Sequence, residues 1–257
     1  MKAVILAGGF GTRISEESAL RPKPMVEIGG RSIIWHIMKI YAAHGIQEFI
    51  ICAGYRGETI KDYFTSYALR RSDVTVDLRH DRIVKHRGDV EPWTVTIVDT
   101  GDATMTGGRL KRVAGHIGAE TFCLAYGDCV SNVDITELVA FHRSSGALAT
   151  VTAIQPPGRF GALRLAEGET KIRSFTEKPE GDGGWVNGGF FVLEPGVLDV
   201  IDGDATVWER DPLERLAERG LLAAHRHEGY WQNMDSLRDK MVLEQQWASG
   251  SPAWRVW

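Results

Sequence analysis

The residues best suited to chemistry lie within the first 25 positions of the chain. An apolar run, AVILA at 3–7, leads into GGFGTR at 8–13, and Lys23 follows between two prolines. Glycines let a backbone approach a ligand closely, and successive N–H groups in such a turn form a concavity that favours anions. Arg13 adds a planar forked cation and Lys23 a compact one. A buried strand, a glycine turn, a hydroxyl and two cations in this order predict a polyphosphate site.

Two common phosphate-binding motifs are excluded in this stretch. It does not supply the Walker sequence G-x-x-x-x-G-K-[ST], and the dinucleotide fingerprint G-x-G-x-x-G begins at Gly9 but fails at Ile14. A glycine turn alone would more often be an ordinary connection from a strand to a helix. Thr12, Arg13 and the Pro-Lys-Pro segment together favour the phosphate interpretation instead.

Composition narrows the class of protein. The chain has 257 residues, of which 43% are hydrophobic and 25% charged, values typical of a globular protein. A net charge of −4 gives no basic surplus for nucleic acid, so phosphates must be met by a local cluster of cations. Three cysteines without metal-ligand spacing indicate reduced thiols in the cytoplasm. No apolar run is long enough for a signal peptide or a membrane span, so no membrane partner is expected.

The hydrophobic pattern predicts alternating strands and helices. Helices are expected from Ser32 to Gly45, near 58–69, and at 106–116, 134–144, 195–201 and 213–219, with strands between them and a capping-type start at Ser236 to Asp239. The strands are expected at 3–7, 49–53, 74–77, 93–99, 121–125 and 147–154, with an antiparallel excursion at 162–166 and 171–175. This order predicts one α/β domain over 1–257, with a mixed, mostly parallel sheet flanked by helices. Ligands of such sheets bind beyond the carboxyl ends of the strands, where Asp128 follows the strand at 121–125.

A family resemblance rests on these motifs. AGGFGTR at 7–13 followed by RPKPM at 21–25 resembles the signature of the sugar-1-phosphate nucleotidylyltransferases, and the resemblance continues along almost the whole chain. SEES at 15–18, DTG at 99–101 and TGGRLKR at 106–112 are similar to the cytidylyltransferase branch. The resemblance implies a nucleotide-diphospho-sugar transferase fold and an enzyme that makes CDP-glucose and pyrophosphate from CTP and α-D-glucose 1-phosphate. It also implies Mg2+ as cofactor.

The same resemblance assigns expected roles to residues. Catalysis is expected from Arg13, Lys23, Asp128 and Lys178, and the metal ligands from Asp128 and Asp235. The nucleotide is expected to contact Leu6, Ala7, Gly8, Gly9, Gly11, Thr12, Arg13, Lys23, Thr104 and Arg109. The sugar phosphate is expected to contact Gly161, Glu177, Lys178, Asn187 and Gly188. Cys129 departs from the branch, which has glycine there, and could shift the backbone beside Asp128.

Three further expectations complete the sequence-based interpretation. Cytosine would be recognised by backbone carbonyls of the 6–9 turn, with the 99–109 loop contributing to the preference. A thymidylyl- or uridylyltransferase acting on a related sugar 1-phosphate remains an alternative, and so does a catalytically silent nucleotide-sensing subunit. The chain is expected to form a homo-oligomer, and Trp247, Trp254 and Trp257 are expected to pack on the body or on another subunit.

Overall fold

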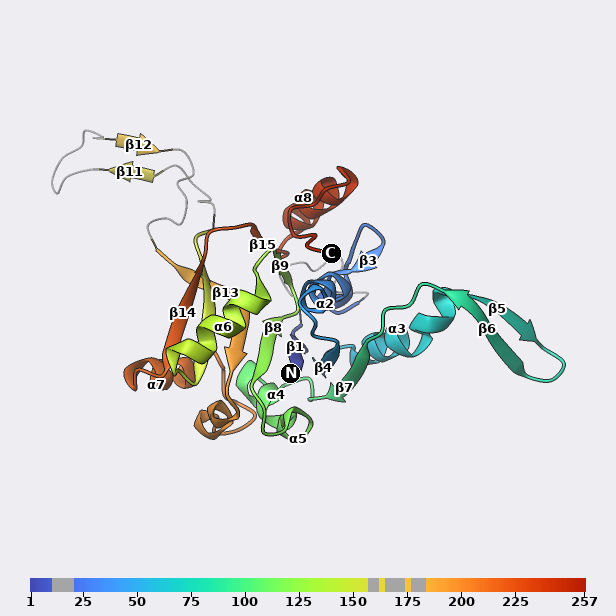
Figure 1. Ribbon diagram of the computed structural model, residues 1–257, viewed down its shortest axis with the longest axis horizontal. Helices are drawn as coiled ribbons and strands as arrows, with labels where there is room; N and C mark the ends of the chain where they lie inside the picture. The colour runs from blue at the N-terminus through green and yellow to red at the C-terminus, as the bar shows by residue number, and fades with distance from the viewer. Residues whose placement is uncertain (11–20, 157–161, 165–173, 177–183) are drawn as a thin grey trace.

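A central seven-stranded sheet organises the computed structural model, which describes residues 1–10, 21–156, 162–164, 174–176 and 184–257 (Figure 1). Its strands run in the order β14-β10-β13-β8-β1-β4-β7. They are β1 (Ala3–Ala7), β4 (Glu48–Ala53), β7 (Thr94–Asp99), β8 (Phe122–Tyr126), β10 (Ala149–Ile154), β13 (Val186–Leu193) and β14 (Leu222–His227). Only β13 runs antiparallel to its neighbours, so the predicted mixed, mostly parallel sheet is confirmed.

The central strand β1 is buried on both faces, as its unbroken apolar sequence predicts. Successive side chains of a strand point to opposite faces. Ile5 packs into the cluster around α2 (Ile33–Ala43), together with its β1 neighbours Ala3 and Ala7. Val4 and Leu6 pack into a second cluster with Leu110 of α4 (Thr106–Arg112). Helices α2 and α4 therefore cover the two faces of β1, the strand that leads into the glycine turn.

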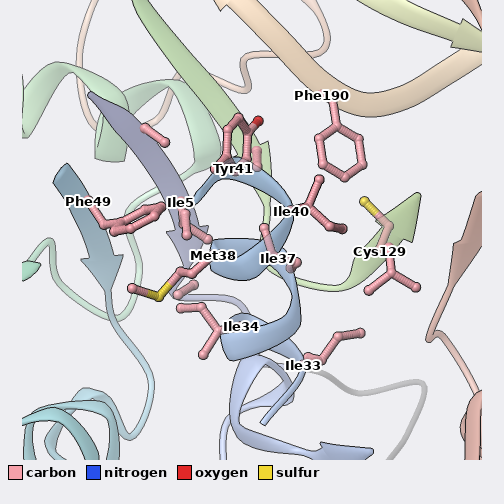
Figure 2. Close-up of a cluster of buried hydrophobic side chains, with 14 of the residues drawn as sticks. Ile5, Ile33, Ile34, Ile37, Met38, Ile40, Tyr41, Phe49, Cys129 and Phe190 are labelled. Carbon is pink, nitrogen blue, oxygen red and sulfur yellow. The ribbon is translucent and has the colours of Figure 1, made fainter. Parts of the chain in front are cut away.

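Helix α2 provides most of the first cluster. Figure 2 shows Ile34, Ile37 and Met38 of this helix among the side chains of Ile5 and Phe49 from the sheet. The helix ends as predicted, because Gly45 adopts a left-handed backbone with φ of +81° and its N–H donates to the Ala42 carbonyl at 3.0 Å. The other helices are α3 (Gly57–Arg70), α5 (Ala114–Ile117), α6 (Ile135–Ser145), α7 (Asp211–Glu218) and α8 (Leu237–Ala248), with 3-10 turns η2 (Lys23–Met25) and η4 (Pro195–Val200).

Two helix predictions were wrong in detail. The helix expected from Thr106 to His116 divides at Val113, whose backbone (φ −96°, ψ 6°) leaves the α-helical range and closes a tight turn to the Leu110 carbonyl. The segment expected as a helix from Pro195 is the 3-10 turn η4. By contrast, Ser236 and Asp239 form a complete capping box at the start of α8, although aspartate is shorter than the usual glutamate.

Small two-stranded sheets extend the body. The predicted antiparallel excursion is present as β11 (Ala162–Arg164) paired with β12 (Ser174–Thr176). Strand β5 (Ser72–Asp77) was predicted, but its partner β6 (Arg82–Gly88) was not, and the two form a hairpin that projects from the body beyond α3 (Figure 1). A further pair, β2 (Glu27–Ile28) and β3 (Arg31–Ser32), precedes α2.

The tryptophans near the carboxyl terminus, Trp247, Trp254 and Trp257, pack on the body of the same chain. Trp254 is fully buried in the first core cluster, with its ring near His36 of α2 and stacked on Trp247. Trp257 packs edge-on against Trp35. Over the described part of the chain, no helix has the length and apolar character needed to cross a membrane.

Candidate active site

A cavity of about 480 Å³ opens beyond the carboxyl ends of β1, β7 and β8, where ligands of parallel sheets bind. The turn after β1, the loop after β7 and the end of β8 provide most of its walls. Its described lining is Leu6, Ala7, Gly8, Gly9, Phe10, Lys23, Pro24, Asp102, Ala103, Thr104, Met105, Thr106, Arg109, Tyr126, Gly127, Asp128 and Glu209. The structure thus brings the expected nucleotide residues 6–9, Lys23, Thr104 and Arg109 together with Asp128.

Lys23 is the central charge of this site. Its side chain comes from η2, where the flanking prolines fix the backbone, and the residue is only 8% exposed. The ammonium nitrogen Nζ lies 2.6 Å from Oδ2 of Asp128 and also contacts Oδ1 of Asp235. Burial acts to lower the pKa of Lys23, but the Asp128 and Asp235 carboxylates more than offset it, so the pKa is raised. Lys23 is therefore a fully charged ammonium held between two carboxylates.

A short antiparallel pair brings the two aspartates together. Strand β9 (Cys129–Ser131) pairs with β15 (Trp231–Asn233), with Cys129 opposite Asn233, and the Met234 N–H donates to the Asp128 carbonyl at 2.9 Å. Asp235 is oriented in turn by the Asn233 amide, whose Nδ2 donates to Oδ2 at 2.7 Å. The two carboxylates therefore face one point from adjacent strands.

The two carboxylates fit a magnesium site that the protein completes only in part. Within the described ranges, no cluster of three or more His, Cys, Asp or Glu side chains could hold a metal by itself. Magnesium commonly takes one or two carboxylates and completes its octahedron with water and substrate phosphates. Asp128 and Asp235 supply hard oxygen donors that already converge on a cation, the Lys23 ammonium. The donor set fits a metal that shares its coordination with a nucleotide.

Arg109 lines the same cavity as Lys23. It is 4% exposed, and its terminal nitrogens donate to oxygens of the chain, including the Gly8 carbonyl at 2.9 Å and Thr100 Oγ1 at 2.7 Å. Burial lowers the pKa of Arg109. Thr104, on the loop that Arg109 braces, is buried and faces the same cavity. Sequence reasoning anticipated that this segment reaches the cavity, but not that Arg109 is engaged by the backbone.

Two of the expected sugar contacts, Asn187 and Gly188, lie at the start of β13, and Asn187 is hydrogen-bonded to Tyr126 in the cavity lining. Asn187 is exposed, and its Nδ2 donates to the Tyr126 hydroxyl at 2.9 Å while its Oδ1 accepts from the Gly189 N–H. The Gly188 carbonyl accepts from the Trp231 indole at 2.7 Å. Tyr126 therefore joins the lining of the cavity to the start of β13. Sequence reasoning missed this tyrosine, although its place at the end of β8, two residues before Asp128, was a usable signal.

Cys129, the residue after Asp128, begins the regular strand β9. Its side chain is buried, and its Sγ donates weakly to the Gly188 carbonyl at 3.6 Å. All three cysteines are free thiols and buried. The remaining predicted site residues lie outside the described residues: Gly11, Thr12, Arg13, Gly161, Glu177 and Lys178.

Comparison with known proteins gives consistent matches over the chain. The family described as "Nucleotidyl transferase" matches residues 2–241. The chain is 57% identical over 258 residues to glucose-1-phosphate cytidylyltransferase of Salmonella typhimurium, with all of both chains covered. It is 43% identical over 258 residues to the probable glucose-1-phosphate cytidylyltransferase of Bacillus subtilis, again with full coverage of both.

Solved structures show the same fold at lower identity. HddC from Yersinia pseudotuberculosis superimposes with a TM-score of 0.70 at 22% identity, covering 96% of this chain and 99% of that one. A UDP-glucose pyrophosphorylase complexed with UDP-glucose superimposes with a TM-score of 0.68 at 17% identity, covering 97% and 98%. These likenesses establish the architecture of the sheet and helices.

Proposed function

The chain belongs to the nucleotidyl transferase family, and on that premise we propose that it makes CDP-glucose and pyrophosphate from CTP and α-D-glucose 1-phosphate. The family and fold predicted from the glycine-turn and Pro-Lys-Pro motifs are confirmed. One observation carries the choice of reaction: the 57% identity to the Salmonella glucose-1-phosphate cytidylyltransferase extends over the full length of both chains. Solved structures of uridine-dependent enzymes are similar to this chain at 17% and 18% identity, which supports the fold alone.

The reaction needs no covalent nucleophile from the protein. An oxygen of the sugar phosphate attacks the α-phosphorus of CTP in line, the new P–O bond forms, and the bond to the bridging oxygen breaks so that pyrophosphate leaves. Catalysis then consists of positioning and neutralisation of charge. Lys23, at the edge of the cavity, would meet the triphosphate. By resemblance, Arg13 would stabilise the leaving pyrophosphate and Lys178 would align the attacking phosphate.

Asp128 and Asp235 would hold Mg2+ in the working enzyme. Bound there, the ion would supply Lewis-acid neutralisation of phosphate oxygens. In this structure the Lys23 ammonium pairs with both carboxylates. With the carboxylates engaged elsewhere, the ammonium would remain charged and would pair with the phosphates instead. Asn233, whose amide donates to Asp235, would keep that carboxylate oriented during the exchange.

Base selection would depend on the two backbone segments that line the cavity. The Leu6 carbonyl already accepts from the Gly127 N–H at 3.0 Å and the Gly8 carbonyl from Arg109 at 2.9 Å. The Gly8 carbonyl accepts a second hydrogen bond from the Tyr55 N–H at 3.4 Å, whereas the Leu6 carbonyl has a second lone pair that can face the cytosine amine. The 102–106 loop forms the opposing wall. A site that presents acceptors to the exocyclic amine leaves polar groups unpaired with uracil, which gives discrimination.

We infer that the chain works as a homo-oligomer in the cytoplasm, and that the β5–β6 hairpin is a contact between copies. A two-stranded hairpin is marginal in water by itself, yet Val74, Val76 and Ile83 are 41%, 52% and 53% exposed, and Val76 lies opposite Ile83. A second copy packed on this face would cover the exposed apolar side chains. The buried free thiols support a reducing compartment.

Sedimentation equilibrium tests the hairpin contact. The wild-type chain should sediment as an oligomer, the Val76→Glu/Ile83→Glu variant should have a lower mass, and Thr75→Glu, on the opposite face, should keep the wild-type mass. A monomeric wild type, or a double variant with unchanged mass, would contradict the assignment.

The activity itself is tested by incubating the protein with CTP, glucose 1-phosphate and Mg2+. Mass spectrometry should identify CDP-glucose, formed in equal amount to the pyrophosphate released. Pyrophosphate release without a nucleotide-sugar, or no turnover of CTP, would reject this reaction.

A further inference from the structure

The Arg109 guanidinium joins the ends of three neighbouring strands. From α4 it donates to oxygens at the carboxyl ends of β1, β4 and β7, which lie side by side in the sheet. Its acceptors are the carbonyls of Gly8 (2.9 Å), Ala53 (3.2 Å), Gly101 (2.8 Å) and Asp102 (3.1 Å) and the Thr100 hydroxyl (2.7 Å). The two terminal nitrogens carry four N–H bonds, so five acceptors use their full donor capacity.

Two glycines leave the space that the guanidinium fills. A Cβ added at Gly8 would lie 2.1 Å from Nη1 of Arg109, and one added at Gly54 would lie 2.3 Å from the same atom. Neither glycine needs its residue type for a left-handed backbone. The end of a long side chain normally moves away from such a clash, but this one is buried and held at both terminal nitrogens. Gly8, Gly54 and Arg109 therefore form a matched set.

The partners of this buried cation are uncharged oxygens. A buried charge is costly unless hydrogen bonds satisfy it. Burial acts to lower the pKa of Arg109, and the hydrogen bonds to the ends of three strands compensate for the lost water. By bonding to both segments, Arg109 fixes the distance between the glycine turn at 8–9 and the loop at 101–106. Both segments line the cavity.

We propose that Arg109 is a positioning residue for the nucleotide, acting through the Gly8 turn and the 101–106 loop. The inference rests on the proposed nucleotidyl transfer, and it replaces direct contact between Arg109 and the nucleotide as the main role of this residue. The Gly8 carbonyl is held by a charge-assisted hydrogen bond, so the turn is preorganised for the phosphates and base. Gly54 shares this role although it is not among the described residues that line the cavity.

The test uses Gly54→Ala, Arg109→Ala, Arg109→Lys and the double variant Gly54→Ala/Arg109→Ala, with Arg112→Ala and Gly115→Ala as controls. Arg112 pairs with Asp204 on the outer side of the same helix, and a Cβ at Gly115 meets open space. Wild-type turnover is first measured across nucleotides, and the preferred nucleotide is used throughout. A wild type that turns over no nucleotide would reject the proposed function, whereas nucleotide affinity measured by calorimetry still tests Arg109.

Gly54→Ala should raise the nucleotide KM and Kd at least tenfold, with the KM for the sugar phosphate changed little. Arg109→Lys should lose as much affinity as Arg109→Ala, since one ammonium cannot span five acceptors at the ends of three strands. The double variant should be no weaker than Arg109→Ala, because the clash disappears with the guanidinium. Near-normal affinity in Arg109→Lys would overturn the proposal in favour of a simple charge contact. Additive losses in the double variant would overturn it too.

Discussion

The Lys23 ammonium lies 2.6 Å from the Asp128 carboxylate and contacts Asp235 at the same time, so the two expected metal ligands hold a cation supplied by the protein. Without that ammonium, two carboxylates would face each other in a largely buried site and repel. Lys23 thus keeps the acidic pair assembled, and a nucleotide that attracts Lys23 would free the pair for a metal.

Replacement of Asp128 by Asn should remove most turnover while leaving the fold intact. The change keeps the shape of the side chain but removes the negative charge that faces Lys23. We expect kcat to fall at least about 100-fold, in the range seen when a preorganised charged group is lost. Asp199→Asn, at an exposed position on η4, serves as the control. Near-wild-type kcat for Asp128→Asn at saturating Mg2+ would show that this carboxylate is not a metal ligand.

Metal binding in the absence of nucleotide should depend on Lys23. Because the ammonium occupies the point on which both carboxylates converge, the wild-type protein should bind Mn2+, a spectroscopic substitute for Mg2+, only weakly. Lys23→Met should bind Mn2+ at least tenfold more tightly by electron paramagnetic resonance titration. Equal or weaker affinity in the variant would mean that Lys23 does not compete with the metal.

Substitution of Lys23 and of Lys178 should affect the kinetic constants of different substrates. Lys23 lines the cavity at the glycine turn, so Lys23→Ala should mainly impair use of the nucleotide. Lys178, expected at the sugar phosphate from the family resemblance, should mainly raise the KM for glucose 1-phosphate when changed to Ala. Steady-state kinetics with each substrate varied in turn measure both effects. Similar losses toward both substrates in both variants would refute the division.

Stability should fall as the pH drops from about 6.5 toward 4 because of His36. Burial lowers the pKa of His36 to about 4, with a raising contribution from the Ile28 carbonyl and a lowering one from Arg31. Nε2 donates to Ile28 at 2.9 Å while Nδ1 accepts from the Trp254 indole at 3.4 Å, so the folded ring is neutral. The unfolded state takes up the extra proton below its own pKa, so the stability is present above about pH 6.5 and lost below it.

The slope attributable to His36 should reach up to about 1.4 kcal/mol per pH unit in that window. Urea unfolding between pH 7 and 4.5 measures it, and His36→Gln should show a shallower pH dependence than wild type. Parallel curves for the two proteins would exclude His36 as the titrating group.

The sequence predicted the sheet well where burial leaves a simple pattern. Strand β1 is an unbroken apolar run because both of its faces are covered, and α2 carries an apolar stripe that ends at Gly45. The hairpin strand β6 has no such pattern, since RIVKHRG is exposed along its whole length. Its pairing with β5 follows from backbone hydrogen bonding, which composition does not reveal.

The site was predicted as a set of residues but not as a set of contacts. Motif spacing placed Lys23, Thr104 and Asp128 near one edge of the sheet, and the cavity brings them together. Nothing local to Lys23 indicated that it would contact carboxylates more than 100 positions away. Likewise the sequence predicts Arg109 as a ligand-facing cation, because its five acceptors lie on three chain segments that only the tertiary fold brings together.

The most direct test of the proposed function is kcat/KM for CTP, UTP, dTTP, ATP and GTP at a fixed concentration of glucose 1-phosphate, followed by pyrophosphate release. Preferential recognition of the cytosine amine predicts the highest value for CTP, with UTP lower by at least tenfold. A dTTP or UTP value above that for CTP would contradict the cytidylyl assignment, while the family membership of the chain would stand.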